Sequence, residues 1–353
     1  MKVFHCDHCG HLVFFENTHC VNCGRLLAFL PDLMVVGSLE PLPDDESRWR
    51  SPLPHAAAEY RLCDNYRDAQ VCNWAIDSPD AGTLCRSCRL TRVVPDQGIA
   101  GHAAAWYRLE VAKRRLVYTL LSLELPFDAL AFEFLADVGA DGQPVLTGHA
   151  NGVITINVAE ADDAERERTR HALGEPYRTL LGHMRHESGH YFWMTLIETD
   201  ASRLERFREL FGDERADYAE ALQKHYRDGV RADWQAQFVT AYASAHPWED
   251  WAETWAHYLH MPDTLEIAAA CGVSLRPRRA DEPVLRSIPA DVTSPDGSFD
   301  VLLSTWHPLT YMLNNLNRGL GMADAYPFVL SATAVDKLRF VHDVVRARAG
   351  LKP

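Results

Sequence analysis

The sequence has no hydrophobic run that could cross a membrane. Its longest apolar stretch, residues 26–36, is interrupted by Pro31 and Asp32, whereas a membrane-spanning helix needs about 20 consecutive apolar residues. The first six residues, MKVFHC, also lack the apolar core of a secretion signal. These absences predict a cytoplasmic protein with no membrane partner.

Positive charge is scarce as well. The chain has 35 Lys and Arg against 49 Asp and Glu, a formal net charge of −14. Nucleic-acid surfaces are built from clustered basic residues, so this balance argues against a nucleic-acid partner. Hydrophobic residues make up 47% of the 353 positions and charged residues 24%, which is ordinary for globular proteins. This length allows one sizeable catalytic domain and a smaller module.

Cysteine is almost absent beyond residue 88, where Cys271 is the only one of nine. We expect Cys271 to be a small buried apolar residue, because nothing near it would activate it as a nucleophile. The other eight cysteines are concentrated before that point, with no export signal. Such clustering is more typical of metal ligands than of disulfides.

The first four cysteines have the spacing of a zinc ribbon. Cys6 and Cys9 form one C-x2-C pair, and Cys20 and Cys23 form a second after ten intervening residues. Each pair brings two thiolates to the ~2.3 Å Zn–S distance, and two pairs complete a tetrahedron. The pattern predicts a four-cysteine zinc ribbon over residues 1–40, with disulfides or a redox pair as the alternative.

The second cluster is spaced more loosely, since only its last two cysteines form a tight pair. Its members are Cys63, Cys72, Cys85 and Cys88. We expect a second structural zinc ion in a module over residues 55–98; the alternative is a mixed site that includes a neighbouring histidine. Structural zinc supplies about 10–16 kcal/mol to such small modules. Both modules are expected to act as a lid, as a docking surface for a protein partner or as structural support.

Beyond residue 100 the pattern changes to α+β. The expected elements are a helix at 104–122 and strands at 129–136, 143–148 and 153–158. Asn151-Gly152, between the last two strands, is a favoured sequence for a two-residue hairpin turn. Helices dominate after residue 161, and we expect one domain over residues 100–353.

One predicted helix, expected to begin at Pro176, carries the clearest chemistry. Within its segment H-E-S-G-H, His186 and His190 lie one helical turn apart and about 40° apart around the axis. Two imidazoles in that arrangement can bind one metal ion. Glu187 lies about 100° from His186, beside the metal, where a general base for water belongs. His183 points to the same face and is expected to pack or to orient a neighbour.

A hydrolytic zinc site needs a third protein ligand and one position open for water. The metzincin solution, a histidine at position 196, is excluded because Leu196 stands there. A later helix has Glu249, Glu253, His257 and His260 on one face. We expect Glu249 to bind the metal and Glu253 to hold a histidine in its binding tautomer, with reversed roles as the alternative. The two histidines are expected to pack.

The pairing of H-E-S-G-H with a distal E-D-W-A-E resembles the gluzincins, in particular the type represented by anthrax lethal factor. That resemblance implies that the first glutamate of the distal motif, Glu249, is the metal ligand. It also implies that a tyrosine seven residues earlier assists the transition state. Tyr242 stands at that position, and the resemblance therefore assigns it the stabilisation of the tetrahedral oxyanion.

Several further segments occur in a characteristic order. They are the CxxCG ribbon, the looser cysteine cluster, TGHANG at 147–152, YRTLLGH at 177–183, EDWAETW at 249–255, NNLNR at 314–318 and YPF at 326–328. Nearly the whole chain thus resembles a bacterial family of zinc-binding metallopeptidases with an N-terminal zinc ribbon. The resemblance implies a zincin-like domain, mostly helical after a small sheet, that acts on a peptide or protein substrate.

Three functions are compatible with these residues. The first is a metallopeptidase with Glu187 as general base, the second a catalytically silent binding or scaffold protein, and the third a zinc hydrolase for a non-peptide amide. The intact Glu187 favours the first over the second, because a purely structural metal site has no use for a base. One catalytic and two structural zinc ions are expected per chain.

Overall fold

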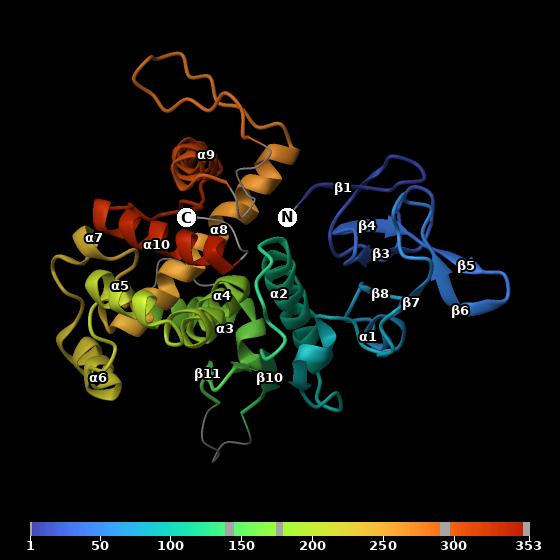
Figure 1. The fold of residues 1–353 in the computed structure, drawn as a ribbon, viewed down its shortest axis with the longest axis horizontal. Coiled ribbons are helices and arrows are strands. Elements are labelled where there is room, and N and C mark those ends of the chain that lie inside the picture. Colours follow the sequence, from blue (N-terminus) through green and yellow to red (C-terminus); the bar gives the residue numbers. More distant parts are fainter. Residues whose placement is uncertain (1, 138–144, 174–178, 290–296, 349–353) are drawn as a thin grey trace. The chain divides into compact units, whose positions relative to one another are not determined.

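The computed structural model describes residues 2–137, 145–173, 179–289 and 297–348 (Figure 1). Small sheets come first and helices follow, which confirms the predicted α+β class. Two compact units are present: residues 1–118, 128–147 and 155–162 form unit 1, and residues 119–127, 148–154 and 163–353 form unit 2. The domain boundaries predicted from the sequence stay a prediction. Each helix in the described ranges is too short or too polar to cross a bilayer.

Unit 1 begins with short antiparallel strands. Strand β1 pairs with β2, β3 pairs with β4, and β5 to β8 form a four-stranded sheet in chain order. The bounds are Phe4–His5 (β1), Leu12–Val13 (β2), Leu27–Leu30 (β3), Val35–Ser38 (β4), Glu40–Leu42 (β5), Asp45–Arg50 (β6), Tyr60–Leu62 (β7) and Ala75–Asp77 (β8). A short helix, α1 (Asp64–Arg67), lies between β7 and β8, and a helical turn, η1 (Cys88–Leu90), follows β8.

An aromatic cluster forms the core of unit 1. The ring of Phe29, on β3, lies 4.5 Å from the ring of Trp74 and 5.8 Å from that of Tyr118. Tyr118 belongs to α2 (His102–Ser122), the helix predicted at 104–122. Strand β9 (Thr91–Val93) pairs in parallel with β10 (Ala131–Leu135), the strand predicted at 129–136. The packing of the Phe29, Trp74 and Tyr118 rings stabilises short strands such as β3, which bury little surface area alone.

The predicted hairpin is formed by β11 (Gly148–Ala150) and β12 (Val153–Asn157). Asn151 and Gly152 have φ angles of 49° and 83°, as a two-residue turn with two left-handed positions requires. The strand predicted at 153–158 is confirmed. That predicted at 143–148 overlaps β11 only at its last residue, and positions 143 and 144 lie outside the described residues.

Unit 2 is built mainly from helices. They are α3 (Asp163–Leu173), α4 (Leu180–Phe192), η3 (Trp193–Ile197), α5 (Ala201–Phe211), α6 (Tyr218–Asp228), α7 (Trp234–Gln237), η4 (Tyr242–Ser244), α8 (Pro247–Ala270), α9 (Phe299–Gly319) and α10 (Ala332–Arg348). The Thr179 side chain accepts a hydrogen bond from Gly182 N and caps α4. The helix start predicted at Pro176 lies outside the described residues. Pro247 occupies the first turn of α8, where proline is well tolerated.

Helices α4 and α8 pack closely against each other in unit 2. Trp251 and Trp255 of α8 are fully buried. The Trp251 indole N–H donates to Gly189 O at 2.8 Å, and that of Trp255 donates to Ser188 Oγ at 3.2 Å. Both tryptophans are thus part of the core, and each indole N–H has a hydrogen-bond acceptor on α4.

The expectation for Cys271 was wrong. This cysteine is exposed. It lies at the C-terminal cap of α8, beyond the part of the helix that is packed in the core. The residue type alone suggested that Cys271 is buried, but Cys271 is exposed because α8 ends there.

Gly189 sets how closely α4 and α8 can approach. A Cβ atom at this position would lie 2.9 Å from Ala252 Cα and 3.2 Å from Trp255 Cβ. We predict that Gly189→Ala lowers the free energy of unfolding by about 1–3 kcal/mol, because an extra methyl group in a filled contact forces the backbones apart. Urea unfolding followed by tryptophan fluorescence measures the effect. Gly319→Ala is the control, since its new Cβ meets nothing within 4 Å; equal stability of both variants would contradict the prediction.

Candidate metal centres

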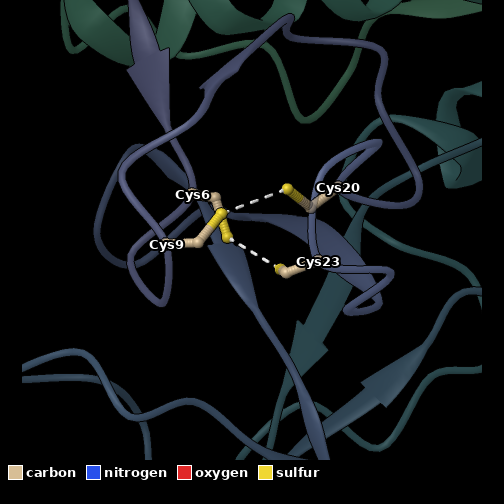
Figure 2. Close-up of side chains that lie close together, drawn as sticks. All are labelled: Cys6, Cys9, Cys20 and Cys23. Carbon is tan, nitrogen blue, oxygen red and sulfur yellow. Dashed lines mark hydrogen bonds between the residues drawn. The ribbon is translucent and has the colours of Figure 1, made fainter.

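The first four cysteines lie around one point. Cys6 Sγ is 3.7 Å from Cys23 Sγ, and Cys9 Sγ is 3.6 Å from Cys20 Sγ (Figure 2). Four sulfur atoms bound at ~2.3 Å to one tetrahedral ion lie about 3.8 Å apart, whereas a disulfide would need about 2.05 Å. All four are free thiols. The donor set and its spacing fit zinc.

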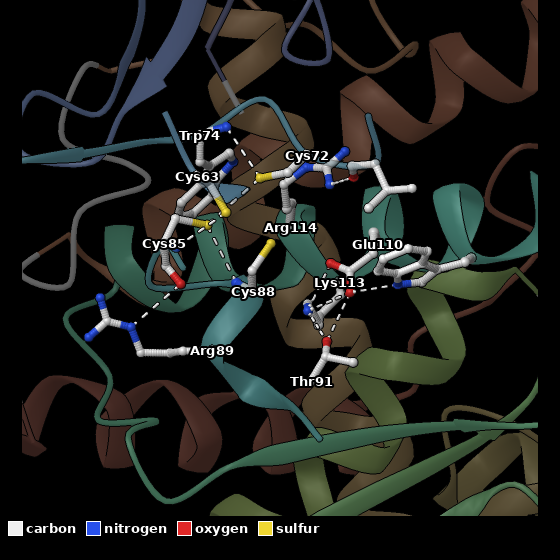
Figure 3. Close-up of polar contacts among 12 residues, drawn as sticks. Cys63, Cys72, Trp74, Cys85, Cys88, Arg89, Thr91, Glu110, Lys113 and Arg114 are labelled. Atoms are coloured by element: carbon white, nitrogen blue, oxygen red, sulfur yellow. Dashed lines mark hydrogen bonds and ion pairs between the residues drawn. The ribbon is translucent and has the colours of Figure 1, made fainter. Parts of the chain in front are cut away.

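The second cluster also brings its four sulfur atoms together, in spite of its looser spacing. All of them lie within 4.8 Å of one another, and Cys72 Sγ is 3.8 Å from Cys85 Sγ (Figure 3). The backbone N–H groups of Trp74, Cys85 and Cys88 donate to sulfur atoms of the cluster. The geometry favours four thiolates over the mixed site with a histidine.

Helix α2 places positive charge beside this second cluster. Arg114 is 1% exposed and donates to Val71 O, the carbonyl next to Cys72 (Figure 3). Burial alone would lower the pKa of Arg114, but the charges of Cys72 and Glu110 raise it. Four thiolates and one Zn²⁺ carry a net charge of about −2, which a buried guanidinium partly offsets. No pattern in the sequence indicated Arg114, because it follows Cys72 by 42 positions and lies in a separate helix.

In unit 2 the predicted catalytic ligands meet in space. His186, His190 and Glu249 each present one donor atom, and these atoms lie within 4.8 Å of one another. His186 Nε2 is 3.0 Å from Glu249 Oε2, and His190 Nε2 is 3.7 Å from Glu249 Oε1. Donor atoms bound at 2.0–2.2 Å to one tetrahedral ion lie about 3.3–3.6 Å apart. The three side chains therefore fit a shared zinc ion.

Glu249 Oε2 adds a second indication of a metal. It is buried and, although close to His186 Nε2, forms no hydrogen bond in the described structure. A buried carboxylate oxygen without a hydrogen bond costs free energy, and a bound cation would remove that cost.

Glu253 contacts the opposite nitrogen of the first histidine. Its Oε1 lies 2.6 Å from His186 Nδ1, which leaves Nε2 of that ring directed toward Glu249. A carboxylate in this position holds a metal-binding imidazole in the required tautomer. The geometry supports the predicted roles of Glu249 as ligand and Glu253 as orienter, which stay a prediction.

Glu187 lies beside the ligands and is contacted by His183. His183 Nε2 is 3.3 Å from Glu187 Oε1, one turn apart on α4. Burial alone would raise the pKa of Glu187, but the hydrogen bond from His183 and the charges of His186 and His190 lower it. Burial would likewise raise the pKa of Glu249, which His190 and His186 bring down to about 2. Both carboxylates are therefore ionised at neutral pH.

Two tyrosines also lie at this site. The ring of Tyr242, the residue assigned by resemblance, is 6.0 Å from that of His186. Tyr218, at the start of α6, donates from its hydroxyl to Glu249 Oε1 at 2.7 Å. Burial and the nearby charge of Glu249 raise the pKa of both phenols, so both hydroxyls keep their protons as donors. Nothing in the sequence pointed to Tyr218, because it stands 31 positions from Glu249 outside any motif.

His149 is the other residue whose place at the site was missed. It lies on β11, which packs on α4, and its ring centroid is 6.2 Å from that of His190. Burial and the neighbouring His190 lower the pKa of His149 to about 4, so the imidazole is neutral. The TGHANG segment marked this histidine only as part of a resemblance and a turn.

The two distal histidines of α8 pack away from the metal ligands. His257 Nδ1 is 2.9 Å from the Tyr326 hydroxyl, and His260 contacts Arg185. Arg185 also pairs with Asp263. The packing role expected for His257 and His260 agrees with these contacts.

Comparisons with known proteins agree with this arrangement. Residues 102–344 match the family model described as "Putative zinc-binding metallo-peptidase", and residues 3–99 match a zinc-ribbon domain. The chain is 43% identical to an uncharacterized protein of Mycobacterium tuberculosis over 353 residues, which is 98% of this chain and 95% of the relative. An uncharacterized protein of Mycobacterium bovis has the same identity and coverage. No solved structure matches the chain.

Substitution of each glutamate separates ligand from orienter. We predict that Glu249→Ala abolishes zinc binding at this site, because a carboxylate ligand is lost. Glu253→Ala should weaken binding about 10- to 100-fold, as removal of an orienting partner does. Competition with a chromogenic chelator, after the cysteine sites are accounted for, measures both affinities. Abolished binding in Glu253→Ala with only weakened binding in Glu249→Ala would assign the ligand role to Glu253.

Proposed function

The chain belongs to the zinc-binding metallo-peptidase family, and from that premise we propose that unit 2 hydrolyses peptide bonds. The observation that supports this proposal is the meeting of His186, His190 and Glu249 around one point, with the ionised Glu187 beside them. Zinc bound there would supply a Lewis acid that polarises a peptide carbonyl and makes a water molecule more acidic.

In this proposal Glu187 is the general base. Its carboxylate takes a proton from the attacking water and then delivers it to the departing amine. His183, 3.3 Å away, holds the carboxylate in place. The geometry of α4 suits this division of roles, because Glu187 lies about 100° from His186 and about 60° from His190 around the helix axis.

The hydroxyl of Tyr242 is proposed to donate a hydrogen bond to the oxyanion that develops as water attacks the carbonyl. Such a donor acts mainly in the transition state. Tyr218, which already donates to Glu249 Oε1, would orient that ligand. The charge of Glu249 raises the pKa of both phenols, so both side chains lie near this ligand.

The two four-cysteine sites are proposed to bind structural zinc, which brings the expected total to three zinc ions. In the second site every cysteine is buried, which closes the metal to substrate, as is typical of structural zinc. Eight free thiols in two metal-type clusters fit a reducing compartment, and a cytoplasmic location is part of the proposal. Docking of a protein partner on the ribbons would be an additional role.

Removal of the base tests the activity. We predict that Glu187→Gln lowers peptide hydrolysis at least about 100-fold, because general-base catalysis contributes that much or more, while its zinc content stays that of the wild type. The assay follows a tryptic digest of casein by mass spectrometry. Glu198→Gln, at an exposed position after α4, is the control and should keep full activity. Full activity of Glu187→Gln at full zinc content would show that Glu187 is not the base.

Removal of single hydroxyls tests the oxyanion donor. We predict that Tyr242→Phe lowers kcat by about 10²- to 10³-fold with little change in KM, since one oxyanion donor contributes about that much. Tyr311→Phe, a substitution of an exposed tyrosine on α9, should leave kcat unchanged. If Tyr218→Phe shows the large loss of kcat and Tyr242→Phe does not, the oxyanion role belongs to Tyr218.

A further inference from the structure

The hairpin turn fixes the position of the proton on His149. The Gly152 backbone N–H donates to His149 Nε2 at 3.0 Å. The left-handed φ angles of Asn151 and Gly152, 49° and 83°, bring this N–H back toward the ring of His149, three residues earlier in the chain. A ring nitrogen that accepts a hydrogen bond carries no proton, so the neutral imidazole has its N–H at Nδ1.

That N–H has no acceptor within the described ranges. His149 Nδ1 is buried and has no hydrogen-bond partner there. Buried donors are nearly always paired, and those that are not call for an explanation such as a ligand or an ordered water. The side chain is held on one side by the turn and is left with a free donor on the other.

Neighbouring rings at the site repeat this pattern. The ring of His190 lies 6.2 Å from that of His149 and 4.5 Å from that of Trp248, and Trp248 lies 6.0 Å from Trp193. His190 Nδ1, Trp248 Nε1 and Trp193 Nε1 are also buried without a hydrogen-bond partner in this part of the structure. With its Nε2 toward Glu249, His190 has its proton on Nδ1. Each of four adjoining aromatic rings thus presents one buried N–H donor without a hydrogen-bond partner in the described structure.

The chemistry of these donors indicates the kind of ligand. Indole and neutral imidazole N–H groups carry no formal charge, and they pair with carbonyl oxygens without the desolvation cost of a charged partner. A peptide in extended conformation presents backbone carbonyls at regular intervals. It also supplies apolar surface for the faces of the tryptophans.

We propose that His149 is a substrate-binding residue, whose Nδ1–H donates a hydrogen bond to a backbone carbonyl oxygen of the bound peptide. The inference rests on the proposed peptidase function and adds a determinant of how the peptide is held. His149 is neither a metal ligand nor the base. It acts on binding through one neutral hydrogen bond on the side of the site lined by the four aromatic rings.

Two substitutions separate the nitrogen atoms of this ring. His149→Gln places an amide near the position of Nε2, so that it can still accept from Gly152 N–H, but it removes the donor at Nδ1. His149→Asn places an amide near the position of Nδ1, which keeps a donor there and removes the acceptor for the turn. A purely structural role of His149 in the hairpin would make His149→Asn the more damaging of the two.

The probes are two hydroxamates that bind to the full-length, zinc-loaded chain. Acetohydroxamic acid can bind the metal but has no peptide carbonyl, whereas a hydroxamate joined to leucyl-phenylalanine amide has both. We expect His149→Gln to lower the affinity for the peptide hydroxamate about three- to tenfold, the effect of one neutral hydrogen bond. Its affinity for acetohydroxamic acid should not change, and His149→Asn should lose less affinity for the peptide probe. Isothermal titration calorimetry measures all these values.

Several other outcomes of these titrations overturn the inference. Equal affinity of the wild type and His149→Gln for the peptide hydroxamate would show that water pairs with Nδ1. An equal loss for both probes, or a larger loss in His149→Asn, would show a structural role. Failure of the zinc-loaded wild type to bind either probe would overturn the proposed function as well. If the peptide probe shows the expected dependence on His149 but no peptide is hydrolysed, the proposed function fails and the inference stands.

Discussion

The contact between α4 and α8 is the constraint on which the candidate metal site of unit 2 depends. Gly189 lies between His186 and His190 on α4 and faces α8. Because it has no side chain, Ala252 and Trp255 approach to distances that a Cβ atom would not allow. The indoles of Trp251 and Trp255 donate to acceptors on α4 at this point. The same approach carries Glu249 and Glu253 to the two nitrogens of His186. Packing and ligand geometry are therefore set by one helix pair.

Charge balance gives the site its second constraint. Buried imidazoles and buried carboxylates occur together here, because neither kind could be kept alone in the interior without a large desolvation cost. The carboxylates keep their charge through the neighbouring imidazoles, as the lowered pKa of Glu249 shows. The second cysteine cluster follows the same rule, with the buried Arg114 beside its thiols. At both sites, groups of opposite charge lie beside the potential metal ligands and offset the cost of burying their negative charge.

Much of this arrangement could be predicted from the sequence, because it follows from local spacing. The turn of helix between His186 and His190, the C-x2-C pairs and the Asn151-Gly152 turn each determine geometry within a few residues. The third ligand needed two helices to meet. The spacing of Glu249 and Glu253 favoured Glu249 with reversed roles as the alternative, and the resemblance to gluzincins also pointed to Glu249. Tyr218, His149 and Arg114 were missed, since their roles arise from contacts between segments that no spacing relates. The predicted burial of Cys271 was wrong, because the general tendency of cysteine to be buried does not tell where a helix extends beyond the core.

The central claim is that this chain holds a zinc ion at the helix pair in addition to the two in its cysteine clusters. Elemental analysis of the purified full-length chain and of His190→Ala, with protein concentration determined independently, tests this claim most directly. The account predicts three zinc ions per wild-type chain and two in the variant, with both cysteine sites still filled. Two zinc ions in each would contradict it, because the convergence of His186, His190 and Glu249 would then bind no metal.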